Sequence, residues 1–212
     1  MANVFQILAK LAGGVGGANV ELQGDPHGSL LVSYGLPPYA DLVRRGKSWG
    51  TMSTAAVAAL VVRPGTVAAF EIFNAYPSGG KSLVVDRLFW FNLVSASVAQ
   101  AWLGWAQVTA PKAAPTSGSF VVRGASGQAY GGPVIAAAGT TVADSGWFPW
   151  SGASTEKVVE ATVTPHGGIV TEVAGRLIVP PQCSLCMHVV AQTVASTFTQ
   201  GATWFEVQLA LE

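Results

Sequence analysis

The sequence predicts an all-β fold, an antiparallel β-sandwich preceded by an extended N-terminal arm. After residue 50, short runs rich in Val, Thr and aromatic residues follow one another, and turn sequences rich in Gly and Pro separate them. No long stretch has the periodicity of an amphipathic helix. Short strands without long helices are typical of a sandwich. We therefore expect one sandwich domain at residues 51–212 and an arm at residues 1–50.

The first fifty residues have the composition of an arm. Two glycine pairs fall within residues 13–17, and three prolines and seven charged residues are spread over the segment. Within it, residues 29–35 (SLLVSYG) predict a strand after the turn GDPHG, and YADLVRRGKS predicts a short helix that starts near Pro38 and ends at Gly46. Because such a segment gains little by folding on itself, we expect it to lie on a neighbouring subunit.

The body of the chain is read as eleven strands. Two of them are rich in alanine, but the neighbouring Thr and Val and the flanking Pro and Gly favour strand over helix. The predicted strands are Ala55–Val62, Val67–Asn74, Ser82–Ser95, Ala101–Val108, Ser119–Arg123, Val134–Ala138, Lys157–Thr164, Ile169–Val173, Arg176–Val179, Ser184–Val194 and Ala202–Leu211.

Two of these strands carry information about burial. Ser82–Ser95 is apolar on both faces apart from Asp86, Arg87 and Asn92, which predicts a central strand covered on each side and a subunit interface. The last strand alternates, which predicts one buried face: Thr203, Phe205, Val207 and Leu209 alternate with Trp204, Glu206, Gln208 and Ala210.

The composition points to a protein partner. The chain has eleven basic and eleven acidic residues among 212, half of its residues are hydrophobic, and seven are tryptophan. An ordinary soluble domain is about a quarter charged, so apolar surface remains to be covered and we expect a homo-oligomer. The net charge of zero argues against nucleic acid. Polar residues interrupt the uncharged stretch between Arg87 and Lys112, and the N-terminus lacks the basic region of a signal peptide, so we expect no membrane span and synthesis in the cytoplasm.

No motif predicts a metal or a cofactor. Cys183 and Cys186 have the spacing of a zinc or redox motif, with His188 close behind, but the chain has no second cysteine pair. On a strand the two thiols lie on opposite faces, too far apart for a disulfide. We interpret them as ordinary reduced thiols, and His188 as a surface or interface residue.

No motif of a known enzyme class is complete in this sequence. Residues 75–82 (AYPSGGKS) match a loose phosphate-binding loop, but a β-rich segment follows where a helix is required, so we interpret them as a hairpin turn with a solvated Lys81. There is no nucleophile elbow, and no histidine has the context of a catalytic base. We therefore expect no enzymatic activity. We interpret the available carboxylates as solvated: Glu71, Asp86, Asp144, Glu156, Glu160, Glu172 and Glu206.

The aromatic residues leave one alternative open. Trp147, Phe148 and Trp150 cluster near turns in GWFPWSG, and exposed aromatic rings stack on sugars, so a carbohydrate-binding module is the second hypothesis. Burial of these rings, in the core or at an interface, is favoured over sugar binding. The remaining tryptophans of the strand patterns are expected to be core or interface anchors: Trp90, Trp102, Trp105 and Trp204.

The order of several segments resembles structural proteins of tailed bacteriophages. These are the arm ending in YADLVRRGKSW, the turn YPSGGKSLVVD, the WFP loop, and GRLIVPPQ followed by TWFEV. The resemblance implies a jelly-roll-like sandwich in the virion, made in the host cytoplasm. It implies a head decoration or cement protein that clamps the major capsid protein or other virion proteins, with trimers favoured, or otherwise a tail or adaptor piece. The implied arm contacts are Tyr39, Leu42, Val43, Arg44 and Arg45. The sugar-binding alternative would then be a receptor-binding module of a phage tail.

Overall fold

The computed structural model describes residues 39–94, 99–143, 146–156 and 167–209, together with residues 23–24 and 30–31. The chain divides into two units, residues 1–40 and residues 41–212. In the first unit, β1 (Gln23–Gly24) pairs antiparallel with β2 (Leu30–Leu31), and only β2 lies in the segment where the sequence predicts a strand. Most of the predicted arm lies outside the described residues.

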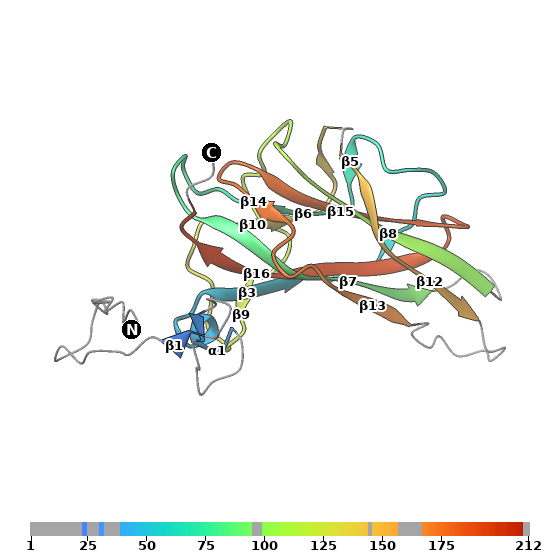
Figure 1. Cartoon of the computed structure of the whole chain (residues 1–212). Coiled ribbons are helices and arrows are strands. Elements are labelled where there is room, and N and C mark those ends of the chain that lie inside the picture. The colour runs from blue at the N-terminus through green and yellow to red at the C-terminus, as the bar shows by residue number, and fades with distance from the viewer. Residues whose placement is uncertain are drawn as a thin grey trace. The chain divides into compact units, whose positions relative to one another are not determined.

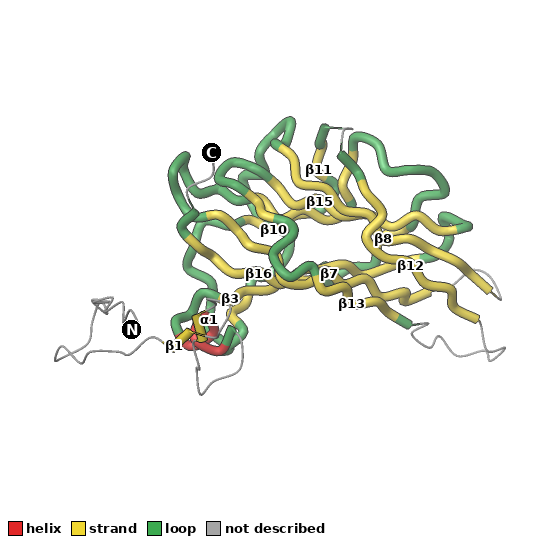
Figure 2. Tube along the Cα trace, in the orientation of Figure 1, coloured by secondary structure: helices red, strands yellow, loops and turns green. Residues whose placement is uncertain are grey.

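The second unit consists of two antiparallel sheets packed face to face (Figures 1 and 2). We name each sheet after one of its inner strands. The β7 sheet has the order β13 (Gly168–Glu172), β7 (Ser82–Val94), β16 (Thr197–Val207), β3 (Ser48–Met52) and β9 (Arg123–Gly124), with β14 (Ile178–Val179) on β7 and β4 (Val57–Ala58) on β16. The β15 sheet has the order β10 (Ile135–Ala137), β6 (Phe70–Phe73), β15 (Ser184–Ala191), β8 (Ala99–Thr109) and β12 (Phe148–Glu156). Outside the two sheets are a separate pair, β5 (Val67–Ala68) with β11 (Thr140–Thr141), and the short helix α1 (Ala40–Arg44).

The strand order is that of a jelly roll. The principal strands in chain order are β3, β6, β7, β8, β12, β13, β15 and β16. Numbered one to eight in that order, they give 1-8-3-6 in the β7 sheet and 2-7-4-5 in the β15 sheet. This is the double Greek key of the eight-stranded jelly roll. The predicted all-β sandwich is therefore confirmed, and it starts at Ser48, inside the range that the sequence assigned to the arm.

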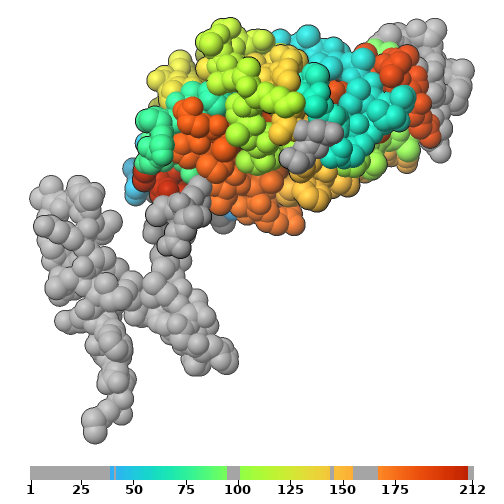
Figure 3. All heavy atoms as spheres, turned by 90° about the horizontal axis from the view of Figure 1, so that it is seen from above, coloured from blue at the N-terminus to red at the C-terminus, as the bar shows by residue number. Residues whose placement is uncertain are grey.

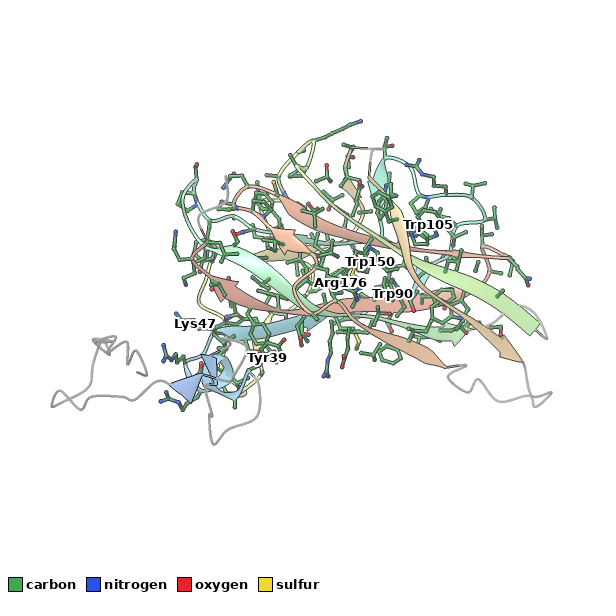
Figure 4. The ribbon with its side chains drawn as sticks, in the orientation of Figure 1. Tyr39, Lys47, Trp90, Trp105, Trp150 and Arg176 are labelled. Carbon is green, nitrogen blue, oxygen red and sulfur yellow. The ribbon has the colours of Figure 1, made fainter. Side chains whose placement is uncertain are left out.

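The core between the sheets contains the largest side chains of the chain. Trp90, Trp102 and Trp204 are almost completely buried there, as the sequence predicted (Figure 4 labels Trp90). Trp90 of β7 lies against Gly104 of β8, where a Cβ would stand 2.6 Å from the indole ring atoms. The absence of a side chain at Gly104 makes room for this ring between the two sheets.

A smaller apolar cluster lies on the other side of the β15 sheet. Ala68, Val142, Trp147 and Cys186 are buried in it, and Trp105 packs against them. Viewed from above, segments that follow β3 and β8 spread over this side of the unit (Figure 3). The predicted alternation along β15 is confirmed, since Leu185, Met187 and Val189 belong to the main core and Cys186 to the smaller cluster. Both cysteines are free thiols.

Most predicted elements are confirmed. The helix is found at Ala40–Arg44, and Gly46 has the positive φ of 63° expected at its end. Seven predicted strands correspond to β5 with β6, β7, β8, β10, β13, β14 and β15. The predicted strand Lys157–Thr164 lies outside the described residues. No helix in the described part of the chain has the length and apolar composition needed to cross a membrane.

Four details of the strand prediction were wrong. Of Ala55–Val62 only Val57–Ala58 forms a strand, and Ser119–Arg123 contributes only its last residue to β9. The strands β1, β3 (both within or at the end of the predicted arm), β11 and β12 were not predicted at all. In β16, Trp204 and Phe205 are both buried, although adjacent residues of a strand point to opposite faces of the sheet. A single buried face was therefore the wrong expectation for β16.

Candidate functional site

The residues expected to make arm contacts lie in α1 or directly beside it in the chain. Tyr39 is half exposed, Arg44 and Arg45 are exposed, and Leu42 and Val43 are partly buried (Figure 4 labels Tyr39). Backbone hydrogen bonds from Gly46 to Val43 and from Lys47 to Leu42 close the helix, and the chain then enters β3. A role for these residues on a partner subunit stays a prediction.

The aromatic cluster at the start of β12 does not form one exposed platform. Trp147 is buried, and its indole Nε1 donates a hydrogen bond to the Gly65 carbonyl at 2.8 Å. Trp150 lies at a β-bulge and packs against the main core, with the Arg176 guanidinium 6.0 Å from its ring centre (Figure 4). Only Phe148 is widely exposed, at 64%. The burial that the sequence favoured for these rings is therefore confirmed for Trp147, whereas Phe148 is exposed in this chain.

A buried carboxylate, Glu206 of β16, holds two loops at one end of the sandwich. Tyr130 donates to its Oε1 at 2.6 Å, and Tyr76 donates to its Oε2 at 2.8 Å. The Lys81 ammonium donates to Tyr76 at 3.0 Å and to Glu206 Oε2 at 3.3 Å. Tyr76 and Lys81 flank the turn before β7, and Tyr130 lies in the loop before β10, so one carboxylate fixes both loops. Glu206 was wrongly interpreted as a solvated residue.

The same network explains the segment that matched a phosphate-binding loop. Lys81 is only partly exposed and forms an ion pair with Glu206, so its interpretation as a simply solvated lysine is wrong. The side chain of Gln208 also bonds the Gly79 carbonyl, which fastens the turn to the end of β16. The turn is therefore held as a hairpin connection by structural contacts.

Three groups of this network favour their protonated forms. Burial, and then the bond to Glu206, raise the pKa of Tyr130 far above its usual range. The pKa of Tyr76 is raised mainly by burial, and the hydrogen bond to Tyr76 raises the pKa of Lys81.

His188, outside this network, has a pKa that burial lowers. His188 is a buried residue of β15 whose Nδ1 accepts a hydrogen bond from the Val189 amide, so its expected surface position was wrong.

These shifts predict a plateau in the pH dependence of stability. Above about pH 10 the unfolded chain loses the tyrosine and lysine protons that the folded chain retains, so the free energy of unfolding falls as pH rises. Below about pH 6.5 the unfolded chain protonates His188 while the folded chain resists, so the free energy of unfolding falls as pH drops. Urea midpoints measured from pH 5 to 12 should show both slopes. Tyr130→Phe should weaken the alkaline slope, and an unchanged slope would contradict this assignment.

A second buried carboxylate lies on the covered side of the β15 sheet. Glu71 of β6 and Gln107 of β8 are the cross-strand neighbours of Cys186. The Ser184 hydroxyl donates to Glu71, and the Gln107 amide donates to the Ala143 carbonyl at 3.0 Å. All four side chains are almost completely buried, and burial followed by the nearby Glu71 raises the pKa of the Cys186 thiol. Glu71 was therefore wrongly interpreted as solvated.

The described residues contain no group of three or more His, Cys, Asp and Glu side chains arranged to hold a metal ion. The two buried carboxylates lie on different sheets, one at the end of β16 and the other on β6. Glu206 accepts hydrogen bonds from the two tyrosine hydroxyls, and Glu71 accepts one from the Ser184 hydroxyl. This arrangement stabilises loops and strands, and it offers no pair of accessible carboxylates for hydrolysis.

The accessible feature is the outer face of the β7 sheet, which faces away from the core. A shallow groove of about 410 Å³ runs along it between Phe89 and Val121, with Gly50 and Thr203 on its floor and Met52 beside them. Phe89 lies over Gly201, and Phe91 lies over Gly168, so each ring fills the space that a side chain would take at that glycine. Val121, Val170 and Met52 are 60%, 54% and 45% exposed. As the sequence predicted, β7 is paired with strands along both edges. Its outward side chains Val84, Phe89 and Phe91 are only partly buried, so cover on this face by a partner stays a prediction.

Comparisons of this chain with protein families, with curated proteins and with solved structures find no match.

Proposed function

We propose that this chain is a non-enzymatic structural protein of a phage virion, and that it acts as a head decoration or cement protein. In this role it stabilises a shell by burying apolar surface against copies of itself and against capsid subunits. The arm adds affinity by wrapping a neighbour, because a tethered segment binds at high effective concentration.

The observation that carries the proposal is the flat apolar face on the outside of the β7 sheet. It combines exposed Val121, Val170 and Met52 with phenylalanine rings that lie on glycine. Contiguous exposed apolar patches of this kind mark interaction sites. The jelly-roll strand order supports the proposal, because this architecture recurs in viral capsid domains. The segments that lead into α1 and the turn before β7 belong to the phage resemblance.

A carbohydrate-binding module of a phage tail is the second candidate, since jelly rolls also occur in lectins. Its aromatic platform is reduced to Phe148, because Trp147 is buried and Trp150 packs on the core. A glycan-array signal that Phe148→Ala abolishes would favour this candidate over the structural role.

The structural role is tested on purified particles. Particles are isolated on density gradients from infected or induced cells that produce this chain, and their proteins are counted by mass spectrometry. We expect the chain at a fixed ratio to the major capsid protein, and we expect particles made without it to lose DNA at a lower temperature. Particles that lack the chain in the producing culture would reject the proposal.

A further inference from the structure

The outer face of the β7 sheet has an ordered arrangement of charge. Five strands contribute one residue each to a single cross-strand row, and neighbours in the row are paired in register. In the order β13, β7, β16, β3 and β9, the row is Glu172, Arg87, Thr203, Gly50 and Arg123. An exposed acidic side chain therefore stands at one edge of the sheet and an exposed basic side chain at the other edge, level with each other.

The adjacent row on the same face is apolar. Each residue of this second row is two positions in sequence from a residue of the charged row and therefore points to the same face. The second row consists of Val170 of β13, Phe89 of β7, Gly201 of β16 and Met52 of β3, again paired in register. Val121 stands beyond them, two residues before Arg123 in sequence, and lines the same groove as Met52. The central position, Gly201, carries no side chain, and the Phe89 ring fills the space above it, so the middle of the face is aromatic.

A two-fold axis along β16 maps this face onto a complementary one. The rotation exchanges the two edges of the sheet and keeps the position along the strands. Glu172 then faces the partner's Arg123, and Phe89 faces the partner's Met52. Gly201 lies on the axis. Two salt bridges would frame an apolar contact, with Arg87 still paired to Glu172 at 3.6 Å and to Asp86 at 3.7 Å in its own chain.

We propose that the outer face of the β7 sheet is the contact between two copies of this chain, related by a two-fold axis along β16. This inference deepens the proposed function, which requires contacts between copies but does not say which face makes them. A two-fold contact gives pairs, whereas the phage resemblance implies trimers, so the measured mass distinguishes the two arrangements.

The size of the face sets the expected strength. Four strand spacings of about 4.8 Å make it roughly 19 Å wide. This is small for a stable interface, which buries on the order of 1,600 Å² in total. We therefore expect a dimer that dissociates on dilution, and sedimentation velocity on the full chain over a wide concentration range is the appropriate measurement.

Two charge reversals test the geometry. Arg123→Glu and Glu172→Arg are both exposed substitutions, so each variant should fold. In either variant alone, like charges meet at both edges of the contact, and we expect dimerisation to weaken by on the order of tenfold or more. In an equal mixture of the two variants, opposite charges meet at both edges again, and mixed dimers should form as well as the unaltered dimer does.

Lys112→Glu is the matched control, because it changes the net charge as Arg123→Glu does but lies in the segment after β8, next to β11. It should leave dimerisation unchanged. A chain that stays monomeric at its highest soluble concentration would overturn the inference, as would reversals without effect or a mixture that fails to associate. Particle composition is measured separately, so the proposed virion role and this contact can fail independently of each other.

Discussion

Glu206→Ala is expected to lower the free energy of unfolding by about 3–5 kcal/mol, the cost of removing one partner from a buried charged network. The substitution leaves the hydroxyls of Tyr130 and Tyr76 without their acceptor, and the Lys81 ammonium keeps only its bond to Tyr76. Because these residues belong to two different loops, the loss should also release both loops from β16. Urea unfolding gives the stability, and hydrogen exchange of residues 76–81 and 128–134 gives the local effect.

Two variants separate the charge from the packing at this position. Glu206→Gln retains one acceptor oxygen and a similar volume, so we expect a smaller loss of stability than for alanine. Glu172→Ala removes a carboxylate whose side chain is 75% exposed and bonds only at the surface, and it should change stability by less than about 1 kcal/mol. Equal losses for Glu206→Ala and Glu172→Ala would contradict the structural role of the Glu206 network.

Gly104→Ala is expected to cost about 2–3 kcal/mol through overpacking of the core. The new Cβ would stand 2.6 Å from ring atoms of Trp90, a distance that Cβ atoms do not tolerate. Trp90 is fully buried between the sheets, so the ring can move only if the strands separate. The stability should be measured by thermal and urea unfolding with tryptophan fluorescence.

A double variant tests whether the clash is the cause. In a Trp90→Leu background the ring is absent, so adding Gly104→Ala should cost much less than it does in the native chain. Gly131→Ala serves as the control, because a Cβ there meets nothing within 4 Å and its φ is not positive. A full additive cost in the Trp90→Leu background would mean that the alanine acts through the backbone of β8 instead.

The sequence predicted the fold class because strand periodicity and turn residues are local signals. The long strand β7 and the faces of β15 followed directly from alternation. The strand β12 was missed because Pro149, Ser151 and Gly152 are typical turn residues. They fit an edge strand, where Pro149 and the bulge next to it also hinder pairing with foreign strands.

The buried carboxylates could not be located from the sequence. Tyr76, Tyr130 and Glu206 are far apart in the chain and meet only through the strand order, so no spacing rule connects them. One weak signal existed, since Glu206 stands between Phe205 and Val207 in an apolar run, and an acid in such a strand needs partners. For Glu71 the covering pair β5 and β11 decides burial, and this small pair was not separable from its neighbours in the sequence.

The position of β16 also has a consequence for biosynthesis. This strand provides the hydrogen-bonding neighbour of both β3 and β7, although β3 leaves the ribosome some 150 residues earlier. Half of the sandwich therefore stays open until residues 197–207 have been translated, and a prematurely terminated product cannot complete its hydrophobic interior. A chain truncated before residue 197 should therefore leave β3 and β7 without their shared neighbour in the β7 sheet.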